Sequence, residues 1–221
     1  MPPIVTDRAA MYDVFQPGLI RGAARLPYAP HKRYFYVEHP EEGWRVYLRS
    51  VCFVHEASVP FDVSRFIVVK RADGDADKAT WEPTKGQMEG KDGLRNPKQG
   101  ILNIMKENVR RETYEESKIA HVQALKYTGL AIQSRENDYP ANTFFQYHIF
   151  NGFAHPNQIT AAKETFAWFA EHPAAFKHQR SDMREKDAIA WYDPVKTKMM
   201  GRWSPTITKL YLKEFTPRPP Q

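Results

Sequence analysis

Three observations predict an α/β (α+β) fold. Short apolar and β-branched stretches occur on both sides of one amphipathic segment, residues 101–117, which has the period of a helix. A second helical segment follows near the end of the chain, at 204–215. Strands before and after a central helix, followed by a terminal helix, are typical of sheets that are covered by helices in a layered sandwich.

Length and composition limit the possible classes of protein. The 221 residues suffice for one sizeable core, so one domain with an extension is favoured over two domains. Cys52 is the only cysteine, which excludes an intrachain disulfide and a cysteine-based zinc cluster. No stretch approaches the roughly 20 apolar residues that span a bilayer, and residues 1–10 lack the layout of a signal peptide. We therefore expect a cytoplasmic protein with no membrane partner.

The first half of the chain predicts an arm, three strands and two connecting segments. Residues 1–33 contain five prolines and predict an extended, irregular arm with a short helix near 8–15, followed by the folded domain at 34–221. Strands are predicted at 34–37, 44–55 and 66–69, where apolar and β-branched residues gather. Asp and Gly residues at 73–77 predict a turn. The segment 81–96, rich in Gly, Pro and Lys, predicts a loop.

The second half predicts two helices and three strands. The clearest helix runs from residue 100 or 101 to about 117. Strands are predicted at 122–133, 142–153 and 188–192, and the second of these alternates with many aromatic residues. The final helix, at 204–215, begins with Ser204 as a plausible N-cap and Pro205 in the first helical position.

The central helix combines an apolar stripe with a cluster of carboxylates. At 3.6 residues per turn, the stripe consists of Ile101, Leu102, Met105 and Val109. The same face continues into Glu112 and Glu116, with Glu115 beside them. Burying these like charges unpaired would cost several kcal/mol or force protonation, so a cation should lie among them. Mg²⁺ or Mn²⁺ suits oxygen ligands of this kind. The alternative is a solvated helix end with ion pairs to Arg110, Arg111 and Lys118.

The segment before this helix could approach a phosphate or a metal. Residues 85–92 read Lys-Gly-Gln-Met-Glu-Gly-Lys-Asp. Glycines allow a close approach of the backbone, and lysines can neutralise phosphate charge. Glu89 and Asp92 add two carboxylates. An ordinary surface loop is the alternative, because loops rich in Gly and Lys are common.

Loop and helix together resemble the Nudix box, G-x5-E-x7-R-E-U-x-E-E-x-G-U, in which U is bulky and apolar. The matching positions are Gly86, Arg111, Glu112, Glu115, Glu116 and Ile119. The approach Trp-Glu-Pro-Thr-Lys-Gly at 81–86 is similar to the Trp-x-x-Pro-(Lys)-Gly of many members. Segment 185–193 is similar to the late family strand that often ends in Trp, so the resemblance covers about residues 44–216.

The box departs from the family pattern at Asp92, in the spacing that follows it and at Lys118. Asp92 stands where the family has Glu, and its shorter side chain puts its role in doubt. Eighteen residues, 93–110, separate Asp92 from Arg111, eleven more than in the family, with the insertion at roughly 93–102. Thr113 occupies the first apolar position, and Lys118 occupies the usual Gly position, so the helix exit is expected to differ. The Arg-Glu-x-x-Glu-Glu core is intact.

The resemblance implies a fold and a set of residue roles. It implies an α/β/α sandwich with a mixed β-sheet, and attack of water on a diphosphate linked to another moiety, dependent on Mg²⁺ (or Mn²⁺). Glu115 and Glu116 are then metal ligands, and Glu112 is a further ligand or the base. Gly86 would lend its carbonyl to a metal that Asp92 also binds. Arg111 would hold the loop or a glutamate. Bases outside the box are expected at Glu164 or Glu185, which are otherwise surface glutamates.

The substrate is expected to be highly phosphorylated. Lys85 directly before Gly86 is similar to members that act on dinucleoside polyphosphates, diphosphoinositol polyphosphates or mRNA caps, and Trp81 and Lys85 are the expected substrate contacts. The net charge of +6 suits such polyanions, or serves only solubility. The basic clusters at 31–33 and 171–186 could bind RNA or substrate phosphates, with a basic linker and a solvated helix as the alternatives.

Three functions are therefore compared. The first is an active Nudix pyrophosphohydrolase. The second is a catalytically inactive Nudix-fold module that binds nucleotide or RNA. The third is an unrelated RNA-binding protein. The three retained carboxylates favour the first over the second, and no ribonucleoprotein motif supports the third.

Overall fold

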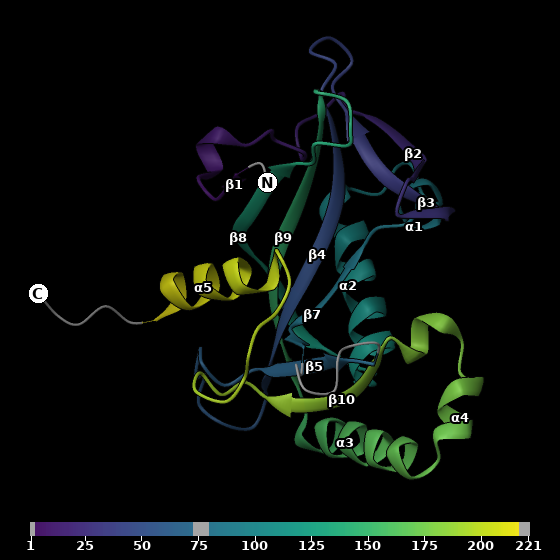
Figure 1. Cartoon of the computed structure of the whole chain (residues 1–221). Coiled ribbons are helices and arrows are strands. Elements are labelled where there is room, and N and C mark those ends of the chain that lie inside the picture. The colour runs from purple at the N-terminus through teal and green to yellow at the C-terminus, as the bar shows by residue number, and fades with distance from the viewer. Residues whose placement is uncertain (1–2, 73–79, 217–221) are drawn as a thin grey trace, which may run out of the picture. The chain divides into compact units, whose positions relative to one another are not determined.

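The computed structural model describes residues 3–72 and 80–216 (Figure 1). The turn predicted at 73–77 lies outside the described residues. The chain divides into two compact units. The first comprises residues 1–51, 86–109 and 127–149, and the second comprises residues 52–85, 110–126 and 150–221. The predicted α/β (α+β) class with a mixed β-sheet is confirmed. No helix within the described residues is long and apolar enough to cross a membrane.

The larger sheet has seven strands in the order β1-β8-β9-β4-β3-β2, and β7 pairs with β4 outside this path. Its strands are β1 (Ile4–Val5), β2 (Ile20–Leu26), β3 (Ala29–Glu38), β4 (Arg45–Glu56), β7 (Thr84–Gln87), β8 (Gln123–Arg135) and β9 (Thr143–Ala154). The strands predicted at 34–37, 44–55, 122–133 and 142–153 are confirmed. The central strand β4 is buried on both faces at ten consecutive positions, which explains its long apolar run.

The N-terminal segment is more ordered than predicted. Instead of an irregular arm, it contains β1, the 3₁₀ helix η1 (Arg8–Ala10) and β2. β2 pairs antiparallel with β3, and β3 begins before the predicted boundary at residue 33. A close approach across this pair requires a glycine, because a Cβ at Gly22 would lie 2.3 Å from the ring of Tyr36. This pairing satisfies the backbone N–H and C=O groups of the segment. The prolines and glycines of the sequence gave no indication of it.

The predicted loop at 81–96 is wrong in most of its length. It contains β6 (Trp81–Glu82), β7 and the short helix α1 (Gly90–Leu94). Within the first unit, the backbone N–H of Met88 donates to the carbonyl of Leu48, and the Met88 carbonyl accepts from Phe35 N–H. These tertiary hydrogen bonds outweigh the low strand propensity of Gly and Pro. The helix α2 (Ile101–Ser117) then begins where predicted.

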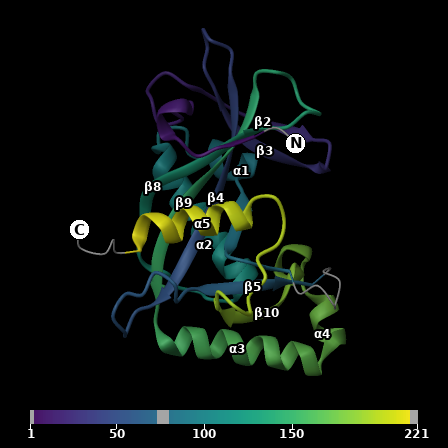
Figure 2. The ribbon, with the colours of Figure 1, turned by 60° about the vertical axis from the view of Figure 1, so that its left-hand side comes forward.

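The second unit contains a three-stranded sheet, β10-β5-β6. β5 (Ile67–Arg71) pairs antiparallel with β10 (Lys186–Trp191), which confirms the strands predicted at 66–69 and 188–192. Helix α3 (Pro156–Glu171), absent from the predicted elements, lies along β10 in both views of the ribbon (Figures 1 and 2). It buries Ile159, Ala162 and Phe166.

The terminal helix α5 (Ser204–Phe215) has the predicted bounds but a different start. Ser204 lies inside the helix, Trp203 is the N-cap, and no side chain caps the first turn. The Ser204 hydroxyl instead donates to Glu82 Oε2 at 3.4 Å, so the predicted N-cap role is wrong. The helix packs into the second unit through Tyr211, whose ring stacks on Phe53 at 3.8 Å between centroids.

Candidate functional site

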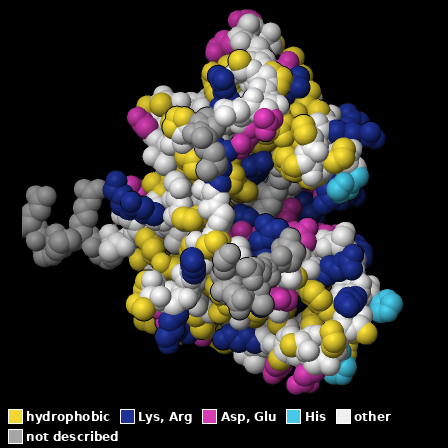
Figure 3. Space-filling view, viewed as in Figure 1, with side chains coloured by type: hydrophobic (Ala, Val, Ile, Leu, Met, Phe, Trp, Pro, Cys, Tyr) yellow, Lys and Arg dark blue, Asp and Glu magenta, His cyan; other side chains and the backbone are white. Residues whose placement is uncertain are grey.

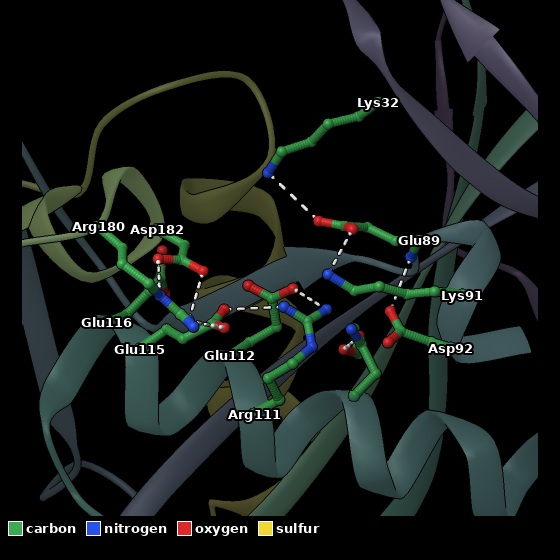
Figure 4. Close-up of polar contacts among 12 residues, drawn as sticks. Lys32, Glu89, Lys91, Asp92, Arg111, Glu112, Glu115, Glu116, Arg180 and Asp182 are labelled. Atoms are coloured by element: carbon green, nitrogen blue, oxygen red, sulfur yellow. Dashed lines mark hydrogen bonds and ion pairs between the residues drawn. The ribbon is translucent and has the colours of Figure 1, made fainter.

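The three predicted carboxylates lie together at the end of α2, within the second unit (Figure 4). Upstream, the helix buries Ile104, Met105 and Val109. Downstream, Glu115 and Glu116 are only 7% and 3% exposed. Thr113 is fully buried in place of the family's apolar residue, and its hydroxyl lies 3.2 Å from that of Thr84. The apolar stripe therefore does run into a face that carries buried carboxylates, as the periodicity predicted.

Arg111 lies between two of the carboxylates. Its Nη2 donates to Oε1 of Glu112 and its Nη1 donates to Oε2 of Glu115, each at 2.8 Å. The guanidinium is one quarter exposed, and Glu115 is nearly buried, so this pair is shielded from solvent more than an ordinary surface ion pair. The role implied for Arg111, holding a glutamate, agrees with this geometry. The fork of a guanidinium can orient two carboxylates at once.

Glu116 joins the helix to the segment that precedes Gly86. Its Oε2 accepts the backbone N–H of Lys85 at 2.8 Å, and its Oε1 lies 2.8 Å from Nζ of Lys186. Lys186 also pairs with Glu82, and Lys85 Nζ lies 2.7 Å from Glu82 Oε2. Lys186, Glu82 and Glu116 are each no more than 5% exposed at the side chain. The four residues form one buried network of alternating charge.

Burial and neighbouring charge act differently on the carboxylates. Burial raises the pKa of Glu116, although Lys186 opposes this. Burial would also raise the pKa of Glu82, but the ammonium groups of Lys85 and Lys186 outweigh it and lower that pKa to about 2. Burial, together with Glu116, Glu115 and Glu185, outweighs Arg111 and raises the pKa of Glu112 to about 8. The neighbouring positive charge is therefore too small to offset burial at Glu112, whereas it more than offsets burial at Glu82.

The donor set fits a hard divalent cation in its chemistry. Glu112, Glu115 and Glu116 supply carboxylate oxygens from adjacent turns of one helix, which are the ligands that Mg²⁺ and Mn²⁺ prefer. In their present rotamers, however, no three His, Cys, Asp or Glu side chains among residues 3–72 and 80–216 converge as a metal site. Protein cations hold the carboxylates instead. Binding a metal would require Glu112 and Glu115 to exchange Arg111 for the ion.

The helix exit has a left-handed conformation at Lys118. Lys118 has a φ of 64°, the left-handed conformation that glycine adopts without strain after a helix. Its backbone N–H donates to Tyr114 O at 2.9 Å. Its Nζ donates to the carbonyls of Glu115 and Met183, each at 2.5 Å. These hydrogen bonds hold a lysine in a glycine-like conformation, and the expectation that the exit would differ from the family's stays a prediction.

The basic segment predicted at 171–186 lies near the carboxylates at one point. It consists of helix α4 (Pro173–His178) and the 3₁₀ helix η2 (Ser181–Arg184). Arg180 Nη2 lies 2.8 Å from Asp182 Oδ2 and 3.9 Å from Glu115 Oε1 (Figure 4). Cationic and histidine side chains gather on the surface over α4 and η2 (Figure 3). The exposed members are His172, Lys177, His178, Arg180 and Arg184.

The remaining motif residues lie in the first unit, where Asp92 has a structural partner. Gly86 follows Lys85 within β7. Asp92 Oδ2 accepts the backbone N–H of Glu89 at 2.9 Å and completes the capping box of α1. Glu89 lies 3.3 Å from Lys32 and 2.8 Å from Lys91 (Figure 4). The insertion at roughly 93–102 thus begins within this capped helix, and the metal roles of Gly86 and Asp92 stay predictions.

The predicted substrate contacts and the predicted bases outside the box differ in burial and in partners. Trp81 is half-buried in β6, and Lys85 is paired with Glu82, so their substrate contacts stay predictions. Glu185 is exposed and close enough to raise the pKa of Glu112, whereas Glu164 is exposed on α3. Glu82 was not predicted as part of the site, and Lys186 was predicted only as the last member of the basic segment 171–186. Two weak signals existed, namely a Glu inside the Trp-x-x-Pro approach and a Lys at the start of an apolar strand.

Comparisons with known proteins find similarity in structure alone. No protein-family model matches the chain, and no curated protein matches its sequence. A NUDIX hydrolase from Nitrosomonas europaea is similar with a TM-score of 0.43 and 10% identity, over 76% of this chain and 88% of that one. A pyrophosphohydrolase from Bacillus subtilis has a TM-score of 0.38 and 10% identity, over 90% and 92%. A NUDIX hydrolase from Listeria monocytogenes has a TM-score of 0.39 and 13% identity, over 77% of this chain and 92% of that one. These values record a distant likeness in fold and nothing finer.

Proposed function

We propose that this chain is a Nudix-type pyrophosphohydrolase that uses Mg²⁺ or Mn²⁺. The observation that carries the proposal is the hydrogen bond from Lys85 N–H to Glu116 Oε2 at 2.8 Å. It joins the Trp-Glu-Pro-Thr-Lys-Gly approach to the Arg-Glu-x-x-Glu-Glu helix, the two halves of the sequence motif. A chance match of either half would give no reason for them to be bonded to each other.

Each residue of the helix has a distinct task in this proposal. Glu115 and Glu116 hold the metal, and Glu112 is either a further ligand or the base that takes a proton from water. The bound ion would polarise the diphosphate and favour ionisation of the water. Arg111 keeps Glu112 and Glu115 oriented through its two hydrogen bonds of 2.8 Å. Lys186 keeps Glu116 in place from the other side, at 2.8 Å.

The proposed substrate carries several phosphates. Arg180 is 74% exposed at the side chain and lies near Glu115, so its guanidinium can reach a ligand that approaches the carboxylates. Lys177 and Arg184 extend the positive surface along the same segment. Dinucleoside polyphosphates, diphosphoinositol polyphosphates and mRNA caps share the charge that such a surface attracts. We expect the protein to act in the cytoplasm.

The second candidate is an inactive module of the same type that binds nucleotide or RNA. One observation favours it, because Arg111 and Lys186 already neutralise carboxylates that a metal would need. An arginine or lysine that replaces a metal leaves a binding surface without Lewis-acid chemistry. The two candidates differ in turnover and in metal affinity, so both can be measured on the same preparation.

The decisive experiment combines a substrate panel with metal binding. Purified protein is incubated with Mg²⁺ or Mn²⁺ and a dinucleoside polyphosphate, a nucleotide sugar, capped RNA or a diphosphoinositol phosphate. Bound Mn²⁺ is counted in parallel by electron paramagnetic resonance. Glu115→Gln should abolish turnover and weaken Mn²⁺ binding, whereas Glu214→Gln, on an exposed position of α5, should change neither. Turnover that survives Glu115→Gln and Glu116→Gln would refute the proposal. Nucleotide binding without turnover or Mn²⁺ binding would favour the inactive module.

A further inference from the structure

The first unit contains a cavity of about 200 Å³ that the proposed function does not use. It lies between the N-terminal segment and strands β8 and β9. The residues that line it are Arg8, Met11, Tyr12, Asp13, Val14, Ala131, Gln146 and His148. For scale, a cavity of about 150 Å³ can hold one benzene molecule. This one therefore has room for a small organic ligand.

The polar part of the lining is fixed by internal hydrogen bonds. Gln146 Nε2 donates to Tyr12 O at 2.9 Å and to Gln133 Oε1 at 2.8 Å. Gln146 Oε1 therefore accepts from His148 Nε2 at 2.9 Å, which leaves Nδ1 as the acceptor for the Tyr127 hydroxyl at 3.2 Å. Burial, and then Arg8, lower the pKa of His148 to about 3, so the ring is neutral. These side chains shape the cavity and give it no charge.

Arg8 brings an exposed guanidinium to the rim of the cavity. Its Nη1 donates to Gly129 O at 3.3 Å and to the Tyr127 hydroxyl. Its guanidinium carbon lies 5.8 Å and 5.7 Å from the ring centroids of Phe15 and Tyr127, which restrict its orientation. No carboxylate in the described part of the chain forms an ion pair with it. The fork of this side chain is therefore available for a ligand carboxylate.

Asp13 brings an exposed carboxylate to the same cavity. Its Oδ1 accepts the backbone N–H of Phe15 at 3.0 Å, which holds the side chain in a local turn. Within residues 3–72 and 80–216, neither Arg8 nor any other cation pairs with it. Two opposite charges thus line one cavity without neutralising each other. A ligand that carries both charges could contact the two side chains together.

We propose that this cavity binds a small zwitterion, an aliphatic α-amino acid of about the size of leucine. The carboxylate would receive charge-assisted hydrogen bonds from Arg8, and the ammonium group would donate to Asp13. The aliphatic side chain would lie against Met11, Val14 and Ala131, which form the apolar part of the lining. A purely anionic ligand would be repelled by Asp13, and a purely cationic one by Arg8.

The test compares three ligands that differ in one charge. Binding to the full-length protein is measured by isothermal titration calorimetry with L-leucine, N-acetyl-L-leucine, which lacks the ammonium group, and L-leucinamide, which lacks the carboxylate. We expect L-leucine to bind at least tenfold more tightly than either derivative. Arg8→Gln should abolish its advantage over L-leucinamide, and Asp13→Asn should abolish its advantage over N-acetyl-L-leucine.

Matched substitutions elsewhere in the first unit serve as controls. Arg95→Gln and Asp138→Asn remove the same charges from exposed positions outside the cavity, and they should leave all three affinities unchanged. Absence of L-leucine binding to the unmodified protein would overturn the proposal. Equal affinities for the three ligands would overturn it as well, because the two charges would then have no role. Circular dichroism spectra establish that each variant is folded.

Discussion

Lys85 and Glu116 are joined by a hydrogen bond of 2.8 Å between a backbone N–H and a buried carboxylate oxygen. The other oxygen of Glu116 lies 2.8 Å from Nζ of Lys186, which also pairs with Glu82. Lys85 of β7, the helix α2 and Lys186 of β10 are therefore connected through one carboxylate. This connection explains how a helix that ends in three glutamates can be buried at all.

Lys186→Met should destabilise the protein strongly. The substitution preserves the apolar stem of the side chain but leaves Glu82 and Glu116 buried without their shared cation. Removing one partner of a buried ion pair costs on the order of 3–5 kcal/mol. Urea unfolding followed by circular dichroism measures this loss. The matched control is Lys70→Met, whose pair with Asp187 is about one third exposed at both side chains. It should cost at most about 1 kcal/mol, and equal losses for the two variants would contradict a buried network.

Lys118 allows the backbone and side-chain contributions at the helix exit to be separated. Both Lys118→Ala and Lys118→Gly remove the hydrogen bonds from Nζ to Glu115 O and Met183 O. Only the glycine variant also removes the strain of a φ of 64°. The glycine variant should therefore be the more stable of the two by about 1 kcal/mol, measured as the difference in free energy of unfolding. A more stable alanine variant would contradict the left-handed conformation.

Gly93 should tolerate no side chain. A Cβ at this position would lie 2.0 Å from the ring of Phe35, which is fully buried and cannot move aside cheaply. Gly93→Ala should cost about 1–3 kcal/mol despite the better helix propensity of alanine in α1. A Cβ at Gly100 would meet no other atom within 4 Å, so Gly100→Ala should cost less than about 1 kcal/mol. Thermal unfolding of the two variants compares them directly.

Features governed by local pattern could be predicted from the sequence. The apolar stripe predicted the bounds of α2. The Ser-Pro start and the apolar period predicted the bounds of α5. The gathering of Glu112, Glu115 and Glu116 on one face followed from their spacing along a helix. The buried strands β4 and β9 were visible because apolar residues dominate both of their faces.

Features governed by tertiary partners could not be predicted in this way. β2 is held by its pairing with β3, and β7 by its pairing with β4, so neither shows a strong pattern of its own. The cation for Glu116 is Lys186, seventy positions later in the chain, and no local signal links the two. Likewise, a lysine at 118 gives no indication of a left-handed φ, because one of the hydrogen bonds that hold it is made with the distant Met183 carbonyl.

The last prediction concerns the stability of the first unit in acid. His148 is buried against Arg8, Tyr127, Gln146 and Phe15, and its pKa is lowered to about 3 from an ordinary value of 6.5. A folded-state pKa below the unfolded one means that the neutral ring stabilises the fold above pH 6.5. This stability is lost as the pH falls toward 3, because the unfolded chain binds the proton first. At 1.36 kcal/mol per pH unit, and with the unfolded ring already half protonated at pH 6.5, the loss between pH 6.5 and 4.5 is about 2 kcal/mol. Urea unfolding at both pH values should show that His148→Gln removes this part of the pH dependence, whereas His172→Gln, at an exposed position, retains it. An unchanged pH dependence in His148→Gln would mean that the ring is not buried in its neutral form.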